Sequence, residues 1–520
     1  MRGSCLVPVF LCAAQALTFT AGRSACAQGP APSSAAPSAF LPSAAPAPST
    51  PTPVPESVTS IIRVELADAD LRQGTQADDL AALEAFYENR PGSLWTTDMG
   101  LSARGQQALF EIEKAGDWGL DAAAFDLPSA GALPSGPDDQ VIAEIKLNLA
   151  ILKYARFARG GRSNPAALGG KVFQTPPVRD PNTVLTEIAA AEAPGAYLRS
   201  LQPQHVQFAR LRRALLVARD GDAAGKLSTE AKRIIMNMER WRWMPEDLSR
   251  VYVWSNTPAF MLYVVKDGAT IYADKTQVGT IGYATPVLSA DMTTVVFNPE
   301  WIAPPTVLRE NLAPALRKKD YTILKKSGFT VSYQGRPVDP TKIDWRRVNI
   351  LDYTFTQRPG PHSNVGKVKF LLPNRHAFVL HDTWPARRKY FQRSMRAIGH
   401  DCVRMEKPNL FAKVILAEGN GWPESKVEGL WENSVNDRVT LDTEIPVYST
   451  YFTAVADESN KITTYPDLYG LDHQLARALF GDVDGFPMPT SEVKRPAVSK
   501  AARWRPPSND VTRSLGFAGN

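Results

Sequence analysis

The pattern of apolar residues changes type near Trp241, and this change limits the folds that the chain can adopt. Before it, apolar residues recur at helical spacing, most clearly from Gln140 to Phe157. After it, short runs rich in β-branched and aromatic residues, such as Val251–Trp254, are separated by turn signals. Helical segments followed by strands indicate an α+β multidomain protein. We expect a helical domain over residues 58–232 and a β-rich domain over residues 233–485.

Three further segments refine this plan. Residues 304–347 are charged and less regular than their surroundings, which predicts an insertion within the β-rich domain. The segment from Asn409 to Glu418 predicts a helix with Asn409 as its N-cap. Residues 486–520 are rich in basic residues and proline, which indicates a disordered tail.

The first 57 residues predict export from the cytoplasm. An apolar run and an A-x-A site at residues 25–27 are typical of a signal peptide over residues 1–27. A lipoprotein signal ending at Cys26 is the alternative, and Arg23 stands where such signals have an apolar residue. Residues 28–57 contain mostly Pro, Ala, Ser and Thr, which predicts an extended tether. No later stretch reaches the roughly 18–20 apolar residues of a membrane helix, so we expect a soluble periplasmic protein.

Cys402 is the only cysteine beyond the predicted signal peptide. A lone thiol in an oxidising compartment is a liability unless it takes part in chemistry. Three of the six histidines, His376, His381 and His400, precede it closely. A cysteine with nearby histidines is typical of an activated thiolate nucleophile.

The cysteine and its histidines could instead be inert or bind a metal. A buried cysteine can be unreactive, and His381 and His400 could join Cys402 as zinc ligands. An HExxH element is absent, and the His-x-Cys spacing is short for two ligands. We therefore expect no metal, and we assign no role to His362 or His376.

One motif, HDT at 381–383, precedes the cysteine, and a second, GHDCVRMEKP at 399–408, contains it. Together with NVGKVKFLLPN at 364–374, they resemble the catalytic domain of L,D-transpeptidases (YkuD type), where an upstream histidine is followed by Ser-His-Gly-Cys. FYENRPGSLW at 86–95 and YLRSLQPQHVQFARLRRAL at 197–215 resemble the helical scaffold domain of the large periplasmic members. The resemblance covers nearly all of the chain after the tether.

The resemblance implies formation of peptidoglycan cross-links through a cysteine acyl-enzyme, with release of D-alanine and without a cofactor. The implied partners are a donor tetrapeptide stem, an acceptor amine and β-lactams of the carbapenem class. Nucleic acid is not implied, and the net charge of +6 suits any anionic partner. The insertion at 304–347 corresponds to a lid-like subdomain.

The resemblance also implies roles for individual residues. Cys402 matches the nucleophile, and His381 matches the base, with the backbone carbonyl of Asp382 orienting its imidazole. His400 matches the second motif histidine, and the backbone N–H groups around Asp401 and Cys402 match the oxyanion hole. Because a free cysteine has a pKa of about 8.5, a histidine that takes its proton raises the reactive fraction.

Two positions depart from the family pattern. Gly399 replaces the usual serine, and Asp401 replaces the usual glycine. A carboxylate beside Cys402 disfavours the thiolate, so we expect a working but slower enzyme. Arg404 and Gly399 are expected to contact the substrate or to support the site.

The sequence leaves several alternatives open. A hydrolase of the same fold, an L,D-carboxypeptidase or endopeptidase, would resolve the thioester with water. A degenerate wall-binding protein is the other alternative, and Asp401 is its best support. The basic run Arg387–Lys389, with Arg393 and Arg396, either borders the active cleft or is a solvated surface.

Overall fold

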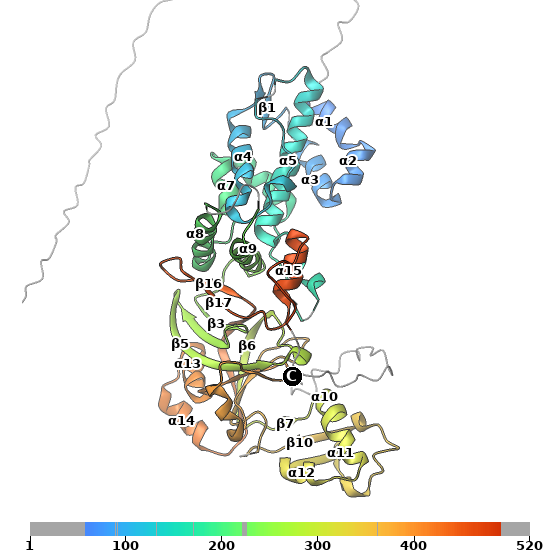
Figure 1. The fold of residues 1–520 in the computed structure, drawn as a ribbon, viewed down its shortest axis with the longest axis vertical. Coiled ribbons are helices and arrows are strands. Elements are labelled where there is room, and N and C mark those ends of the chain that lie inside the picture. The colour runs from blue at the N-terminus through green and yellow to red at the C-terminus, as the bar shows by residue number, and fades with distance from the viewer. Residues whose placement is uncertain are drawn as a thin grey trace, which may run out of the picture. The chain divides into compact units, whose positions relative to one another are not determined.

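A computed structural model describes residues 58–489, except residues 89, 91, 132, 170, 221–225 and 361 and the side chain of Asp70. The predicted signal peptide, the predicted tether and the tail from residue 490 onward lie outside the described residues. Helices dominate the first part of the described chain and strands the second (Figure 1). Within this part of the chain, no helix is both long and apolar enough to cross a membrane.

In the first part, the helices before α8 pack around one apolar core, to which α3, α4 and α5 contribute the buried side chains of Leu83, Ile112 and Ile151. The longest helix, α5, contains the predicted segment Gln140–Phe157, and this prediction is confirmed. It begins at Pro137, a residue that suits a first helical turn. The elements are α1 (Val58–Leu66), α2 (Ala69–Gly74), α3 (Ala77–Glu88), β1 (Thr96–Thr97), β2 (Gly100–Leu101), α4 (Ala103–Glu113), α5 (Pro137–Gly160), α6 (Pro181–Ala190), α7 (Pro194–Ser200), α8 (Val206–Asp220) and α9 (Thr229–Arg242).

The second part is built on a nine-stranded sheet of order β13-β5-β14-β12-β11-β6-β15-β3-β4. The sheet closes because β4 also pairs with β5. The predicted run Val251–Trp254 lies in β3, as expected. The strands are β3 (Val251–Asn256), β4 (Met261–Lys266), β5 (Ala269–Gly279), β6 (Leu288–Phe297), β11 (Val368–Leu371), β12 (Leu380–His381), β13 (Ala397–Gly399), β14 (Val403–Met405) and β15 (Asp437–Thr450).

Three helices and a hairpin complete the β-rich domain: α13 (Pro408–Asn420), α14 (Glu424–Glu432), α15 (Leu471–Phe480), and the paired strands β16 (Ala454–Ala456) and β17 (Ile462–Thr464). The helix predicted from Asn409 is present, but Asn409 is not its N-cap. Lys407 is the cap residue, and Pro408 occupies the first turn. The side chain of Asn409 instead donates to Glu428 of α14.

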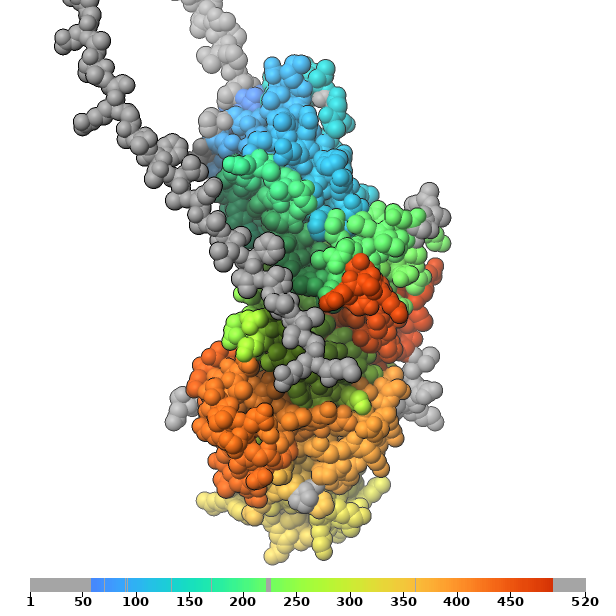
Figure 2. All heavy atoms as spheres, turned by 90° about the vertical axis from the view of Figure 1, so that its left-hand side faces the viewer, coloured from blue at the N-terminus to red at the C-terminus, as the bar shows by residue number. Residues whose placement is uncertain are grey.

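Helices α8 and α9 pack against the sheet and share its core. Trp241 and Trp243 are buried, and the Trp241 ring stacks on Phe452 with centroids 4.6 Å apart. Helix α15 also contacts α9. In Figure 2 the orange-red surface of the β16–β17 hairpin lies against the green surface of α8. One apolar core therefore connects the end of the helical region to the sheet.

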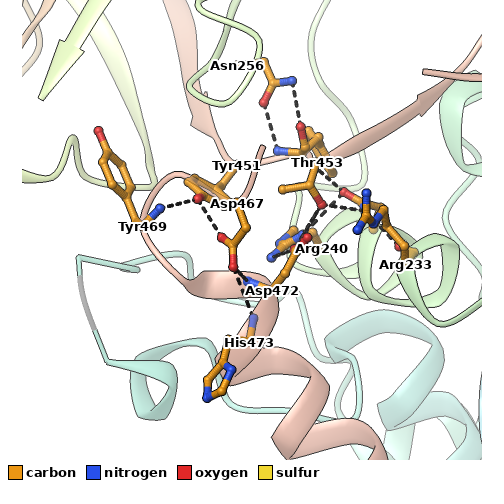
Figure 3. A network of polar contacts seen from close by, with 11 residues as sticks. Arg233, Arg240, Asn256, Tyr451, Thr453, Asp467, Tyr469, Asp472 and His473 are labelled. Atoms are coloured by element: carbon orange, nitrogen blue, oxygen red, sulfur yellow. Dashed lines mark hydrogen bonds and ion pairs between the residues drawn. The ribbon is translucent and has the colours of Figure 1, made fainter. Parts of the chain in front are cut away.

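A buried polar network strengthens this connection (Figure 3). Arg240 Nη2 of α9 lies 2.7 Å from Asp472 Oδ1 of α15. The hydroxyl of Thr453 donates to the same carboxylate at 2.9 Å. Asp467 accepts from the Tyr451 hydroxyl at 2.8 Å and from the backbone N–H of Asp472 at 3.0 Å. The buried carboxylates of Asp467 and Asp472 thus have partners, as their removal from water requires.

Residues 301–357 form a subdomain with its own apolar core and a four-stranded sheet of order β7-β10-β8-β9. The predicted insertion at 304–347 lies inside it. Phe355, Trp345 and Leu316 are buried in its core. Its elements are β7 (Trp301–Ile302), α10 (Pro305–Val307), a π-helical turn (Leu308–Leu312), α11 (Ala313–Arg317), α12 (Thr322–Ser327), β8 (Phe329–Tyr333), β9 (Arg336–Pro337) and β10 (Tyr353–Gln357). The predicted α+β multidomain fold with an insertion is confirmed.

Candidate active site

The pairing of two short strands places Cys402 near His381. Strand β12 runs parallel to β14, with Leu380 opposite Val403 and His381 opposite Arg404. Leu380 and Val403 are buried in the main core. Because successive side chains on a strand point to opposite faces, Cys402 and Arg404 lie on the same face as His381. The strand register thus brings together residues that are 21 positions apart in the sequence (402 − 381 = 21).

The thiol of Cys402 lies in an apolar part of this face. It packs against Val296, Leu371 and Val379, and it is a free cysteine. Its Sγ atom is 3.9 Å from the carbonyl oxygen of Ala377. Burial raises the pKa of the thiol, and the backbone N–H of Val379 opposes this shift. A base is therefore needed to generate the thiolate at neutral pH.

The imidazole of His381 lies on the same face of the sheet as Cys402. It is buried, and its Nδ1 donates to the backbone carbonyl of Asp382. This contact leaves Nε2 as the unprotonated nitrogen. Burial, followed by the positive charge of Arg404, holds the pKa of His381 well below its usual value. The ring is therefore neutral at neutral pH.

The side chain of Asp382 fixes the peptide group that contacts His381. Its carboxylate accepts from the backbone N–H groups of Lys367 at 2.8 Å and Thr383 at 2.6 Å. Arg388 Nη2 donates to it at 2.6 Å. Gly366, at φ +63°, leaves the necessary space, since a Cβ there would lie 2.3 Å from the carboxylate. Burial raises the pKa of Asp382, and Arg388 opposes this shift.

The residues on the N-terminal side of Cys402 have partners from distant parts of the chain. The His400 ring meets the Tyr283 ring edge to face, with centroids 4.2 Å apart. Burial, followed by the charge of Arg404, lowers the pKa of His400. Asp401 Oδ1 lies 2.5 Å from Lys171 Nζ, and Asp401 does not have a positive φ. The replacement of the family glycine by aspartate therefore requires no left-handed backbone.

Arg404 is enclosed next to Gly399, the last residue of β13. Burial lowers the pKa of Arg404 to about 10. Among the described residues, its Nε and Nη1 atoms have no hydrogen-bond partner. These two donors are buried, and Nη1 lies against Gly399.

The arginines of the basic run and the histidines other than His381 and His400 contact different parts of the chain. Arg388 holds Asp382, and Arg396 donates to the backbone carbonyls of Thr276 and Phe260. His376 stacks on Phe173, whereas His205, His362 and His473 contact Pro245, Trp384 and Phe486. In the described part of the chain, no three His, Cys, Asp or Glu side chains gather as metal ligands would.

Three residues of this site could not be identified from the sequence. Lys171 and Tyr283 lie far from Cys402 in the sequence and carry no motif. Arg388 was part of a basic run that could equally have been solvated. Only its contact with Asp382 distinguishes it from its neighbours.

Two segments of the chain are similar to known protein families. Residues 250–428 match the L,D-transpeptidase catalytic domain, and residues 81–215 match the scaffold domain. Residues 250–428 are thus similar to the catalytic domain of the L,D-transpeptidase family and residues 81–215 to a scaffold domain, as the motifs predict. A Haemophilus influenzae protein, provisionally named an L,D-transpeptidase, is 33% identical over 251 residues. This match covers 48% of the chain and spans about half (50%) of that relative.

Proposed function

We propose that this protein is an L,D-transpeptidase that cross-links peptidoglycan stem peptides through an acyl-enzyme on Cys402. The observation that carries the proposal is the pairing of β12 with β14. It sets Cys402 and His381 on one face, with His381 Nδ1 held by the carbonyl of Asp382. The provisional name of the relative supports the same activity.

Acylation begins when Nε2 of His381 takes the thiol proton of Cys402. The sulfur attacks the carbonyl carbon after the third residue of a donor tetrapeptide stem. A C–S bond forms, the C–N bond to the terminal D-alanine breaks, and His381 returns the proton to the leaving amine. The backbone N–H groups of Asp401 and Cys402 stabilise the oxyanion, each by about 3 kcal/mol.

Deacylation transfers the acyl group to an amine of an acceptor stem. The amine attacks the thioester carbon and His381 takes its proton. An amide bond forms, the C–S bond breaks, and His381 returns the proton to the sulfur of Cys402. His400 supports the loop before Cys402 through its ring contact with Tyr283.

Positive charge beside the cysteine suits this substrate. The positive charge of Arg404 is assigned to the attraction of a carboxylate of the donor stem, and Gly399 leaves room for its guanidinium. Cys402 is also assigned as the site of acylation by carbapenems. Since peptidoglycan lies outside the inner membrane, the proposal requires the periplasmic location predicted from residues 1–27.

The test uses the purified protein with a disaccharide-tetrapeptide from bacterial cell wall and mass spectrometry of the products. We expect a cross-linked dimer that lacks one D-alanine, and none with Cys402→Ala. Accumulation of tripeptide without dimer would replace the proposal with a hydrolase. Unchanged substrate, with no acylation of Cys402, would favour a wall-binding protein.

A pair of histidine variants tests the role of the base. His381→Gln should reduce dimer formation by at least about 100-fold, the range of general base catalysis. His473→Gln is the matched control, since His473 Nδ1 also contacts a backbone carbonyl, that of Phe486. Its rate should remain within about twofold of wild type.

A further inference from the structure

A short segment that follows α5 lies against the strand β6 and the turn before it. Val172 forms a parallel β-bridge with Val287, and its side chain is buried in the main core. The backbone N–H of Val287 donates to the carbonyl of Lys171, and Phe173 N–H donates to the carbonyl of Val287, both at 2.8 Å. Ser289 Oγ donates to the side chain of Gln174 at 2.9 Å. The backbone of residues 171–174, which lie within the match to the scaffold domain, is therefore fixed on the sheet.

Two side chains of this segment reach both sides of Cys402. Lys171 Nζ lies 2.5 Å from Oδ1 of Asp401, the residue directly before the cysteine. The Phe173 ring stacks on His376 with centroids 3.5 Å apart and an interplanar angle of 9°. His376 precedes Ala377, whose carbonyl oxygen is the one near the thiol. The segment thus contacts the two loops that enclose the sulfur.

The ion pair has an electrostatic consequence at the thiol. Asp401 raises the pKa of Cys402 after the larger effect of burial, whereas Lys171 lowers it. The side chains of Lys171 and Asp401 are 36% and 33% exposed, so water weakens both effects without abolishing them. An ion pair this exposed contributes little to folding, and its position beside the nucleophile is its distinguishing feature.

We propose that Lys171, a residue of the scaffold-domain segment, is a positioning residue of the active site that neutralises Asp401 and fixes the loop carrying Cys402. The proposal rests on the proposed role of Cys402 as nucleophile. It gives the scaffold domain a direct part in catalysis. It also explains how this chain accommodates a carboxylate where the family has glycine.

The test is the pH dependence of Cys402 alkylation by iodoacetamide in the full chain. Trypsin releases residues 397–404, so mass spectrometry follows this cysteine alone. Lys171→Met should move the midpoint upward and slow alkylation at pH 7 by about three- to tenfold, equivalent to ~0.5–1 pKa unit. Asp401→Asn should move the midpoint downward. The double variant should lie near wild type, and Lys171→Arg should retain the wild-type midpoint.

The variants change only the ion pair between Lys171 and Asp401, and a matched control accompanies them. The other charged or titratable groups around the thiol, Arg404, His381 and His400, are unchanged in all variants. Lys266→Met is the matched control, because Lys266 forms a comparably exposed ion pair with Glu418 at 2.9 Å, and it should leave the midpoint unchanged. If Lys171→Met and Asp401→Asn shift the midpoint in the same direction, or neither shifts it, the proposal fails.

Alkylation needs no peptidoglycan, so this result is independent of the cross-linking assay. Opposite shifts together with absent cross-linking would support the role of Lys171 and remove the proposed function. Normal cross-linking with unchanged midpoints would support the proposed function and contradict the role of Lys171. Circular dichroism of each variant checks that the fold is retained.

Discussion

Arg404 occupies space that a side chain at Gly399 would fill. A Cβ atom on Gly399 would lie 2.0 Å from Nη1 of Arg404 and 3.2 Å from the carbonyl oxygen of Val278. Arg404 is only 8% exposed, so its guanidinium cannot move freely into solvent. Glycine at residue 399, where the family has serine, therefore leaves the space that the guanidinium of Arg404 occupies in this chain.

Restoring the family residue should disturb this arrangement. Gly399→Ser forces the guanidinium of Arg404 to move, and we expect acylation of Cys402 to slow about tenfold, or ~1.4 kcal/mol. Acyl-enzyme formation with a carbapenem, followed by intact mass, measures the rate. Gly282→Ser is the control, since a Cβ there meets no atom within 4 Å. An unchanged rate for Gly399→Ser would contradict the link.

The buried His381 should make stability depend on pH. Burial, and then Arg404, lower its pKa in the folded state, whereas in the unfolded chain it is about 6.5. As the pH falls below about 6.5, the unfolded chain binds a proton that the folded one excludes. The free energy of unfolding therefore falls by up to ~1.4 kcal/mol for each pH unit below this value because of His381.

Urea unfolding at pH 5.5, 6.5, 7.5 and 8.5 measures this dependence. His381→Gln should reduce the loss of unfolding free energy between pH 6.5 and 5.5. Between pH 7.5 and 8.5 the variant and the wild type should show the same slope, because the histidine is neutral in both states. Equal slopes at acid pH would mean that His381 keeps an ordinary pKa.

The elements that could be predicted are those whose pattern is long enough to repeat. Helix α5 covers several turns with apolar residues at helical spacing, and β3 carries a run of β-branched and aromatic residues. Strand β12 has two residues and β14 has three, too few for any period to appear. Their parallel pairing depends on tertiary contacts that no local pattern contains.

The same limit applies to the candidate site. Cys402, His381 and His400 could be named because their chemistry is concentrated in one stretch of sequence. Lys171 could not, since it lies 230 positions from Asp401. The N-cap of α13 was assigned wrongly because Asn409 is a favoured cap residue, whereas Pro408, directly before it, sets the helix start.

The ion pair between Arg240 and Asp472 should be important for stability. Their side chains are 5% and 2% exposed, so Arg240→Met leaves a buried carboxylate without its cation. We expect a loss of about 3–5 kcal/mol in the free energy of unfolding, measured by urea denaturation. The double variant Arg240→Met/Asp472→Leu should lose less. Arg210→Met, which breaks an exposed pair with Glu458, should cost less than about 1 kcal/mol.

Tyr283 connects the candidate active site to the insertion, and removal of its hydroxyl group tests this connection. Its ring contacts His400, and its hydroxyl donates to Glu310 in the π-helical turn Leu308–Leu312. Tyr283→Phe keeps the ring contact and removes one hydrogen bond, worth about 1 kcal/mol. Amide hydrogen exchange in residues 305–317 should therefore become about fivefold faster. Tyr333→Phe, in the same subdomain, should leave that exchange unchanged, and equal exchange in both variants would show that the hydroxyl does not restrain the insertion.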